Sequence, residues 1–249
     1  MTKGRVRAAY LRVLRETQAI TMTFCALGVL QLRNAHSCYL ILGAIAAAWT
    51  AKLLKHCIRQ PRPTGSGKVT YGMPSTHSSS MAFIGVYLAL CFMLLEIHPR
   101  ARMIIPGANH AAQQLHGDKR ALFGQSSRLL FAAVSLLLAV SVCWSRVRLD
   151  YHTKEQVLAG AALGTTVACL AFAAWLGTDT MQELTGRHTV LGLQGGFQQF
   201  SGTLDTLVEN GLFALRDAYY ARDYRIAVSA IKNSLTTIAS LRPAYSVEL

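Results

Sequence analysis

Two histidines stand at the polar ends of apolar segments, where an imidazole could act on a charged group. His77 follows a turn that contains Gly72 and Pro74, and Ser75 is a good N-cap for the apolar helix expected after it. The N–H groups of the first helical turn, together with the helix dipole, favour a negatively charged ligand at such a position. The second histidine, His152, precedes another apolar segment.

Gln156 lies four residues after His152, so the two side chains share one face of the predicted helix. That spacing lets the side-chain oxygen of the glutamine hold one imidazole nitrogen while the other nitrogen attacks an electrophile. A neutral glutamine, however, lacks the negative charge that would stabilise an imidazolium.

Basic residues accompany these histidines in two further places. Lys55 and Arg62 are separated by six residues, and Pro61 and Pro63 stiffen the loop around the arginine. Arg146 lies shortly before the second histidine. Ammonium and guanidinium groups bind phosphate oxygens through charge-assisted hydrogen bonds, so the pattern suits a phosphoryl group.

Each of these segments also has a simpler interpretation. The Lys55–Pro63 segment is typical of the basic flank of a membrane helix, and the Pro74–His77 turn of an ordinary helix cap. The Ser145–Gln156 segment resembles a basic interfacial loop. Taken singly, each segment favours its simpler interpretation.

The composition indicates a polytopic membrane protein with one compact helical domain. The chain has 249 residues, of which 52% are hydrophobic and only 15% charged, and its formal net charge is +13. The apolar segments argue against nucleic acid as the partner and favour an anionic headgroup or phosphate substrate. The six cysteines form no C-x-x-C pair, so they indicate neither a disulfide framework nor a zinc site.

The hydropathy pattern predicts an all-α bundle of about five membrane spans. The spans are Gln18–Leu32, Cys38–Leu54, Met81–Ile97, Leu129–Trp144 and Gln156–Leu176. The first is short for a bilayer core of about 30 Å, which needs roughly 20 helical residues. We therefore divide the chain into a basic N-terminal segment (1–17), a transmembrane domain (18–176) and a C-terminal tail (177–249).

The tail contains no predicted span but has a helical pattern of its own. Apolar and aromatic residues recur at helical spacing, namely Leu204, Leu207, Leu212, Leu215 and Tyr219. This spacing predicts amphipathic helices that dock on the bundle or lie at the membrane interface.

The predicted topology brings the polar segments together. Because each span crosses the membrane once, the loops after the second and fourth spans face the same side. The three segments Lys55–Pro63, Pro74–His77 and Ser145–Gln156 therefore meet in one compartment.

In this arrangement the chain resembles the type-2 phosphatidic acid phosphatase family. The signature of that family is K-x6-R-P, then P-S-x-H, then S-R-x5-H-x3-D, and every position is present except the last, where Gln156 replaces aspartate. The resemblance covers roughly Cys38–Leu176. The runs Tyr71–Ser78 and Tyr151–Thr153 with Gln156 resemble the dolichyldiphosphatase subgroup, which also carries glutamine there.

The resemblance implies a role for each motif residue. His152 is the nucleophile that forms a phosphohistidine, His77 is the general acid and base, and Gln156 orients His152. The phosphate-binding residues are Lys55, Arg62, Ser75 and Arg146. The resemblance implies neither a metal nor another cofactor, since fixed cations can stabilise the transition state.

The resemblance further implies a polyprenyl diphosphate substrate, namely dolichyl diphosphate, which is cut to dolichyl phosphate in support of lipid-linked oligosaccharide synthesis and protein N-glycosylation. It places the chain in the endoplasmic reticulum membrane with the site facing the lumen. The Lys and Arg count on the two sides does not choose an orientation, and nothing in the sequence indicates the oligomeric state.

Two alternatives stay open on the sequence. The substrate could be another lipid phosphate, such as phosphatidate or a sphingoid phosphate. The chain could also be a lipid-binding relative that lost turnover through Gln156.

Overall fold

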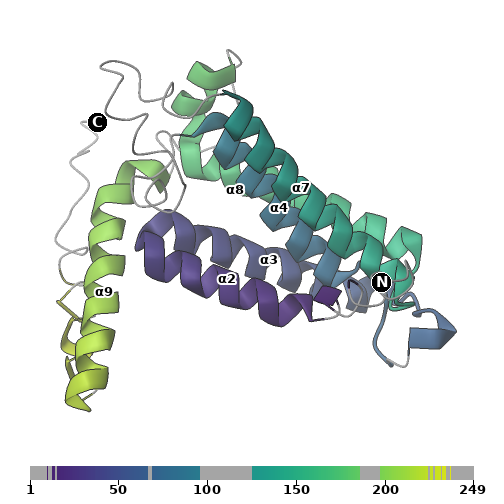
Figure 1. Cartoon of the computed structure of the whole chain (residues 1–249), viewed down its shortest axis with the longest axis horizontal. Helices are drawn as coiled ribbons and strands as arrows, with labels where there is room; N and C mark the ends of the chain where they lie inside the picture. Colours follow the sequence, from purple (N-terminus) through teal and green to yellow (C-terminus); the bar gives the residue numbers. More distant parts are fainter. Residues whose placement is uncertain are drawn as a thin grey trace, which may run out of the picture.

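The computed structural model describes residues 16–66, 69–95, 125–185 and 197–223, with Tyr10, residues 13–14 and short pieces between 225 and 236. Within these residues every regular element is helical (Figure 1). The α-helices are α2 (Thr17–Leu32), α3 (Ala35–Ile58), α4 (Thr76–Leu94), α7 (Gln125–Arg148), α8 (Lys154–Thr185) and α9 (Ser201–Ala221). The short 3-10 turns η1 (Thr64–Ser66) and η2 (Phe197–Phe200) join them. The predicted all-α class is confirmed.

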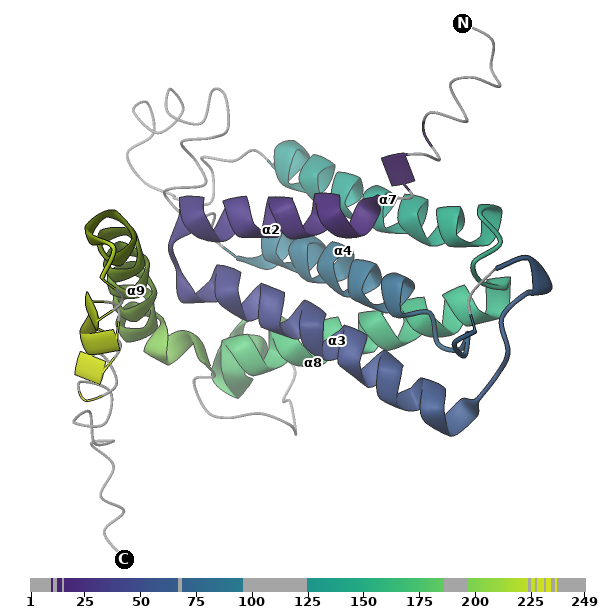
Figure 2. The same ribbon diagram turned by 90° about the horizontal axis from the view of Figure 1, so that it is seen from below.

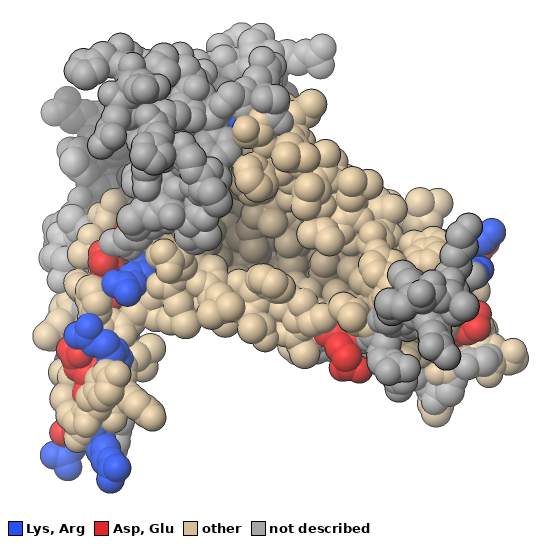
Figure 3. All heavy atoms as spheres, viewed as in Figure 1, with Lys and Arg blue, Asp and Glu red and all other residues tan. Residues whose placement is uncertain are grey.

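Among the described helices, 4 are long and apolar enough to cross a membrane. They are Ala35–Ile58, Thr76–Leu94, Ser127–Arg148 and Lys154–Gly177. Helix α2, the predicted first span, has 16 residues and is about 24 Å long, shorter than a bilayer core. On the face shown in Figure 3, most of the charged side chains lie over α9 and at the opposite end of the bundle, and the part of the described surface between them is mainly uncharged. This distribution suits a polytopic bundle.

Helix α4 is the centre of the bundle, because it packs against α3, α7 and α8. Helices α4 and α8 run parallel: Gly160 faces the backbone of Ser75, and Gly164, one turn later, faces the backbone of Ser79. A Cβ atom at Gly164 would overlap the Ser79 carbonyl, so the two backbones approach as closely as only glycine allows. Both helices therefore begin at the same end of the bundle.

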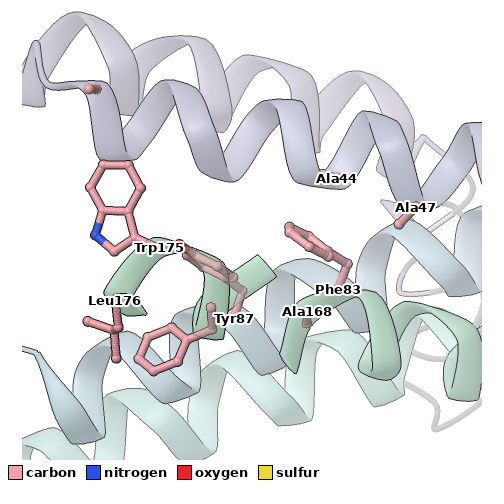
Figure 4. Close-up of a cluster of buried hydrophobic side chains, with 9 residues drawn as sticks. Ala44, Ala47, Phe83, Tyr87, Ala168, Trp175 and Leu176 are labelled. Carbon is pink, nitrogen blue, oxygen red and sulfur yellow. The ribbon is translucent and has the colours of Figure 1, made fainter. Parts of the chain in front are cut away.

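The hydrophobic core lies between α3, α4 and α8 (Figure 4). Phe83 and Tyr87 of α4 stack with ring centroids 5.5 Å apart, and Trp175 and Leu176 close the cluster from α8. Helix α3 contributes small residues such as Ala47, which is fully buried. Small side chains on α3 leave room for the aromatic rings of its neighbours.

Helices α3 and α7 continue past the predicted ends of their spans into basic residues. Helix α3 continues to Ile58, so Lys55 lies in its last turn, and α7 continues to Arg148, so Arg146, which was predicted in a loop, is helical. Basic side chains in a last turn interact favourably with the carbonyl end of the helix dipole, which the hydropathy pattern does not register. Helix α4 begins at Thr76 and ends at Leu94.

The tail docks across the end of the bundle at which α3 begins. In Figures 1 and 2 helix α9 lies crosswise at that end, far from the Arg59–Ser75 loop. The Ala35 N–H donates to the Asp205 carboxylate at 2.7 Å, and Leu204 and Val208 pack against the core. Helix α8 breaks at Gly177 (φ 80°), where the predicted tail begins.

The three-part division of the chain stays a prediction. Residues 1–9 of the basic N-terminal segment lie outside the described residues, as do 186–196 and 237–249 of the tail.

Replacing Gly164 by alanine should force α4 and α8 apart. We expect G164A to lower the free energy of unfolding in detergent by about 1–3 kcal/mol, the usual cost of overpacking. Gly28 on α2 is the matched control, because a Cβ there meets nothing within 4 Å. G28A should leave the stability unchanged or raise it by up to about 1 kcal/mol. Equal effects of the two variants would contradict the close packing.

Candidate active site

The predicted site residues gather at one end of the bundle, where α3 and α7 end and α4 and α8 begin. Lys55 lies in the last turn of α3, and Arg62 in the loop that follows. Ser75 and His77 stand at the start of α4. The second histidine lies in the turn between α7 and α8, and its glutamine partner in the first turn of α8.

His152 is held by its two ring nitrogens. Its Nδ1 lies 3.2 Å from Oε1 of Gln156, and its Nε2 lies 3.0 Å from Nη1 of Arg62. A guanidinium only donates and an amide oxygen only accepts, so these contacts assign the proton to Nδ1 and a lone pair to Nε2. That tautomer leaves the outer nitrogen able to attack.

Arg62 is fixed by more than the histidine. Its Nε donates to the Thr70 carbonyl and its Nη1 to the Tyr151 carbonyl, both at 2.9 Å. Desolvation by burial lowers the pKa of Arg62 from its ordinary value. The guanidinium therefore has a set position beside Nε2, where an incoming phosphoryl oxygen would be a stronger acceptor than the imidazole.

The surroundings of His152 keep its ring neutral. Burial lowers its pKa most, and the positive charges of Arg62 and Lys55 lower it further. Hydrogen bonding to Gln156 and to the Gly72 backbone acts in the opposite direction, and the resulting pKa is about 3. At neutral pH the ring therefore carries no charge, as a nucleophile requires.

Ser75 ties the start of α4 to the start of α8. Its backbone N–H donates to the Gln156 carbonyl at 2.9 Å, and its fully buried hydroxyl accepts from the Ser78 N–H and hydroxyl at 3.4 and 3.0 Å. His77 lies in the first turn of α4 and is partly exposed. The structure thus anchors the His77 turn to the segment that carries the other histidine.

Arg146 turns toward the N-terminal segment. Its Nη2 donates to the Leu14 carbonyl and lies 3.4 Å from the Thr17 hydroxyl, and its Nε donates to Ser145 at 3.3 Å. The Arg146 backbone carbonyl accepts from the N–H of His152 at 3.3 Å. Arg146 therefore joins the turn that carries His152 to the N-terminal segment. No sequence signal marked Leu14 or Thr17 as its partners.

Other residues at the site escaped the sequence reasoning. The carbonyl of Pro61 accepts from Nε2 of Gln156 at 2.8 Å, and Gln60 Oε1 accepts from the same nitrogen at 3.3 Å. Gly72 packs against the Gln156 side chain. Gly72 and Pro61 could be recognised in the sequence as turn residues, but nothing in the sequence indicated that they contact Gln156.

Among the described residues, no three His, Cys, Asp or Glu side chains gather as metal ligands. A reaction without a metal or another cofactor stays a prediction.

Comparison with known proteins places this geometry in a family. Residues 36–178 match the PAP2 superfamily. The chain belongs to this superfamily. The matched range contains every predicted site residue, so the resemblance inferred from the motifs is confirmed, and it excludes α2 and α9.

The PAP2 chain is also similar to curated proteins. It is 31% identical to dolichyldiphosphatase 1 of Dictyostelium discoideum over 61% of this chain and 58% of the relative. It is 33% identical to dolichyldiphosphatase 1 of Rhinolophus ferrumequinum over 57 and 53%, and 26% identical to dolichyldiphosphatase of Saccharomyces cerevisiae over 56 and 52%. The chain thus spans between 52 and 58% of these relatives' lengths. No solved structure matches it.

The neutral His152 should make stability depend on pH. An unfolded histidine titrates near pH 6.5 and the folded one at about 3, so between these values only the unfolded state binds the proton. The stabilisation is complete above pH 6.5 and is lost as the pH falls. Compared with H152N, which cannot titrate there, the wild type should lose about 2 kcal/mol between pH 7 and pH 5. If the wild type and H152N differ in unfolding free energy by the same amount at pH 7 and at pH 5, the lowered pKa of His152 is contradicted.

Proposed function

We propose that this PAP2 protein is an integral membrane phosphatase that removes the terminal phosphate of dolichyl diphosphate. The observation that carries the proposal is the state of His152: Gln156 holds its Nδ1, and its Nε2 faces the Arg62 guanidinium. A neutral nucleophile beside a fixed cation is what attack on a phosphoryl group requires. The named activity of the relatives supports a lipid diphosphate as substrate.

The first step is attack by His152 Nε2 on the terminal phosphorus. A phosphorus–nitrogen bond forms, the bond from that phosphorus to the bridging oxygen breaks, and dolichyl phosphate leaves. His77 donates a proton to the leaving oxygen as general acid. Arg62 and Lys55 stabilise the charge on the phosphoryl oxygens, with Ser75 and the start of α4 beside them.

The second step is hydrolysis of the phosphohistidine. His77 takes a proton from water, whose oxygen bonds to phosphorus while the phosphorus–nitrogen bond breaks. Inorganic phosphate leaves, and Nε2 regains its lone pair. Gln156 holds the Nδ1 proton throughout, so the ring keeps its orientation. The proposal also counts Arg146 among the phosphate-binding cations, although its Nη2 and Nε are engaged with Leu14, Thr17 and Ser145 in the structure.

The proposed cellular setting follows from the substrate. The dolichyl chain lies between helices with its diphosphate at the cationic end of the bundle, and the site faces the lumen of the endoplasmic reticulum. Recycling of the lipid to dolichyl phosphate then supports lipid-linked oligosaccharide synthesis and protein N-glycosylation.

Phosphate release from a panel of lipids tests this function. In detergent with excess chelator, we expect the purified protein to release phosphate from dolichyl diphosphate faster than from dolichyl phosphate, phosphatidate or a sphingoid phosphate. H152A should lose at least about a thousandfold in kcat, because it lacks the nucleophile. H56A, which removes an exposed histidine at the end of α3, should keep the wild-type rate. Faster turnover of a monophosphate lipid would contradict the proposed substrate.

The covalent intermediate can be trapped directly. When dolichyl diphosphate labelled in its terminal phosphate is quenched during turnover, we expect a label on the protein that is stable in base and lost in acid, as for phosphohistidine. The label should be absent from H152A and present in H56A. A label that persists in H152A would place the nucleophile elsewhere.

A further inference from the structure

The carboxamide of Gln156 has every hydrogen-bonding position occupied. Its oxygen accepts from His152 Nδ1 at 3.2 Å and from the Thr153 N–H at 3.3 Å. Its nitrogen donates to the Pro61 carbonyl at 2.8 Å and to Gln60 Oε1 at 3.3 Å. The residue is fully buried, and an amide offers two acceptor and two donor positions in all. One side chain thus joins the histidine turn to the Gln60–Arg62 loop.

Gly72 makes room for this side chain. A Cβ atom on Gly72 would overlap the carbon, oxygen and nitrogen of the Gln156 carboxamide. The Gly72 N–H donates to the Gln60 carbonyl at 2.8 Å, and the Gly72 backbone lies near enough to the His152 ring to raise its pKa. The position therefore lies against the Gln156 carboxamide and bonds Gln60, and it leaves no space for a side chain.

We propose that Gly72 is a positioning residue: its missing side chain lets the Gln156 carboxamide bridge His152 and the Arg62 loop, and this bridge sets the guanidinium against the nucleophile. The proposal rests on the proposed function. Because Arg62 directly follows Pro61, the bond from Gln156 to the Pro61 carbonyl fixes the backbone from which the guanidinium reaches Nε2.

The bridge also explains why glutamine serves at position 156. A carboxylate has no N–H, so it would turn a lone pair toward the Pro61 carbonyl, which can only accept a hydrogen bond. Aspartate would be shorter by one methylene as well. In this chain the residue needs to donate to one loop while it accepts from the histidine, and negative charge alone does not meet that need.

A double-mutant cycle tests the bridge. We expect G72A to lower kcat for lipid diphosphate at least about thirtyfold, with a smaller change in KM, because the histidine acts in the transition state. In the Q156A background the alanine at position 72 has no carboxamide to displace, so G72A/Q156A should have the kcat of Q156A alone. A core-packing variant provides the control: G43A, which would meet the Phe83 ring, should combine additively with Q156A. Additive effects of G72A and Q156A would overturn the proposal.

Two acidic variants separate bridging from charge. Q156E keeps the length and the acceptor, and Q156D carries the wider family's residue, so both should lose at least about tenfold in kcat. Activity equal to or above that of the wild type in either variant would overturn the proposal.

The thermal unfolding midpoints of the same variants test the bridge even if the proposed function fails. If the wild type releases no phosphate from any lipid, that function fails, while the bridge still requires G72A to lower the midpoint in the wild-type background and not in Q156A. Equal shifts in both backgrounds would reject the bridge.

Discussion

The parallel packing of α4 against α8 is the constraint from which the site follows. Gly160 and Gly164 let the two backbones touch, and the Ser75 N–H bonds the Gln156 carbonyl at the point where both helices begin. Two helix N-termini then face the same polar space, and both dipoles present their positive ends to it. The backbone geometry thus favours an anion at this end of the bundle before any basic side chain is added.

The basic side chains act on this framework in different ways. Arg62 contacts the His152 ring directly, and the charge of Lys55 acts on that ring at longer range. The guanidinium of Arg146 is engaged with Leu14 and Thr17, so the N-terminal segment reaches the back of the site although it lies outside the range matched to the family. Burial is the largest cause of the lowered pKa of His152, so the imidazole is neutral while the basic side chains around it are cations.

The sequence predicted what depends on local pattern. Apolar runs located four candidate spans and the shorter helix α2, and the four-residue spacing of His152 and Gln156 anticipated their hydrogen bond. The ends of α3 and α7 were missed because a basic last turn reads as loop in a hydropathy pattern. The contacts of Gly72 and of Arg146 depend on segments that are far apart in the chain, and no local rule reports such an approach.

The contact between Arg62 and His152 has a consequence for selectivity. The lone pair of His152 Nε2 is already engaged by Arg62, so in the proposed mechanism this nitrogen cannot attack until another acceptor draws the guanidinium away. A neutral ester is too weak an acceptor to do so, whereas a phosphoryl dianion competes well. In the proposed cycle, headgroups are first distinguished by how strongly each one binds Arg62, before any covalent bond forms or breaks.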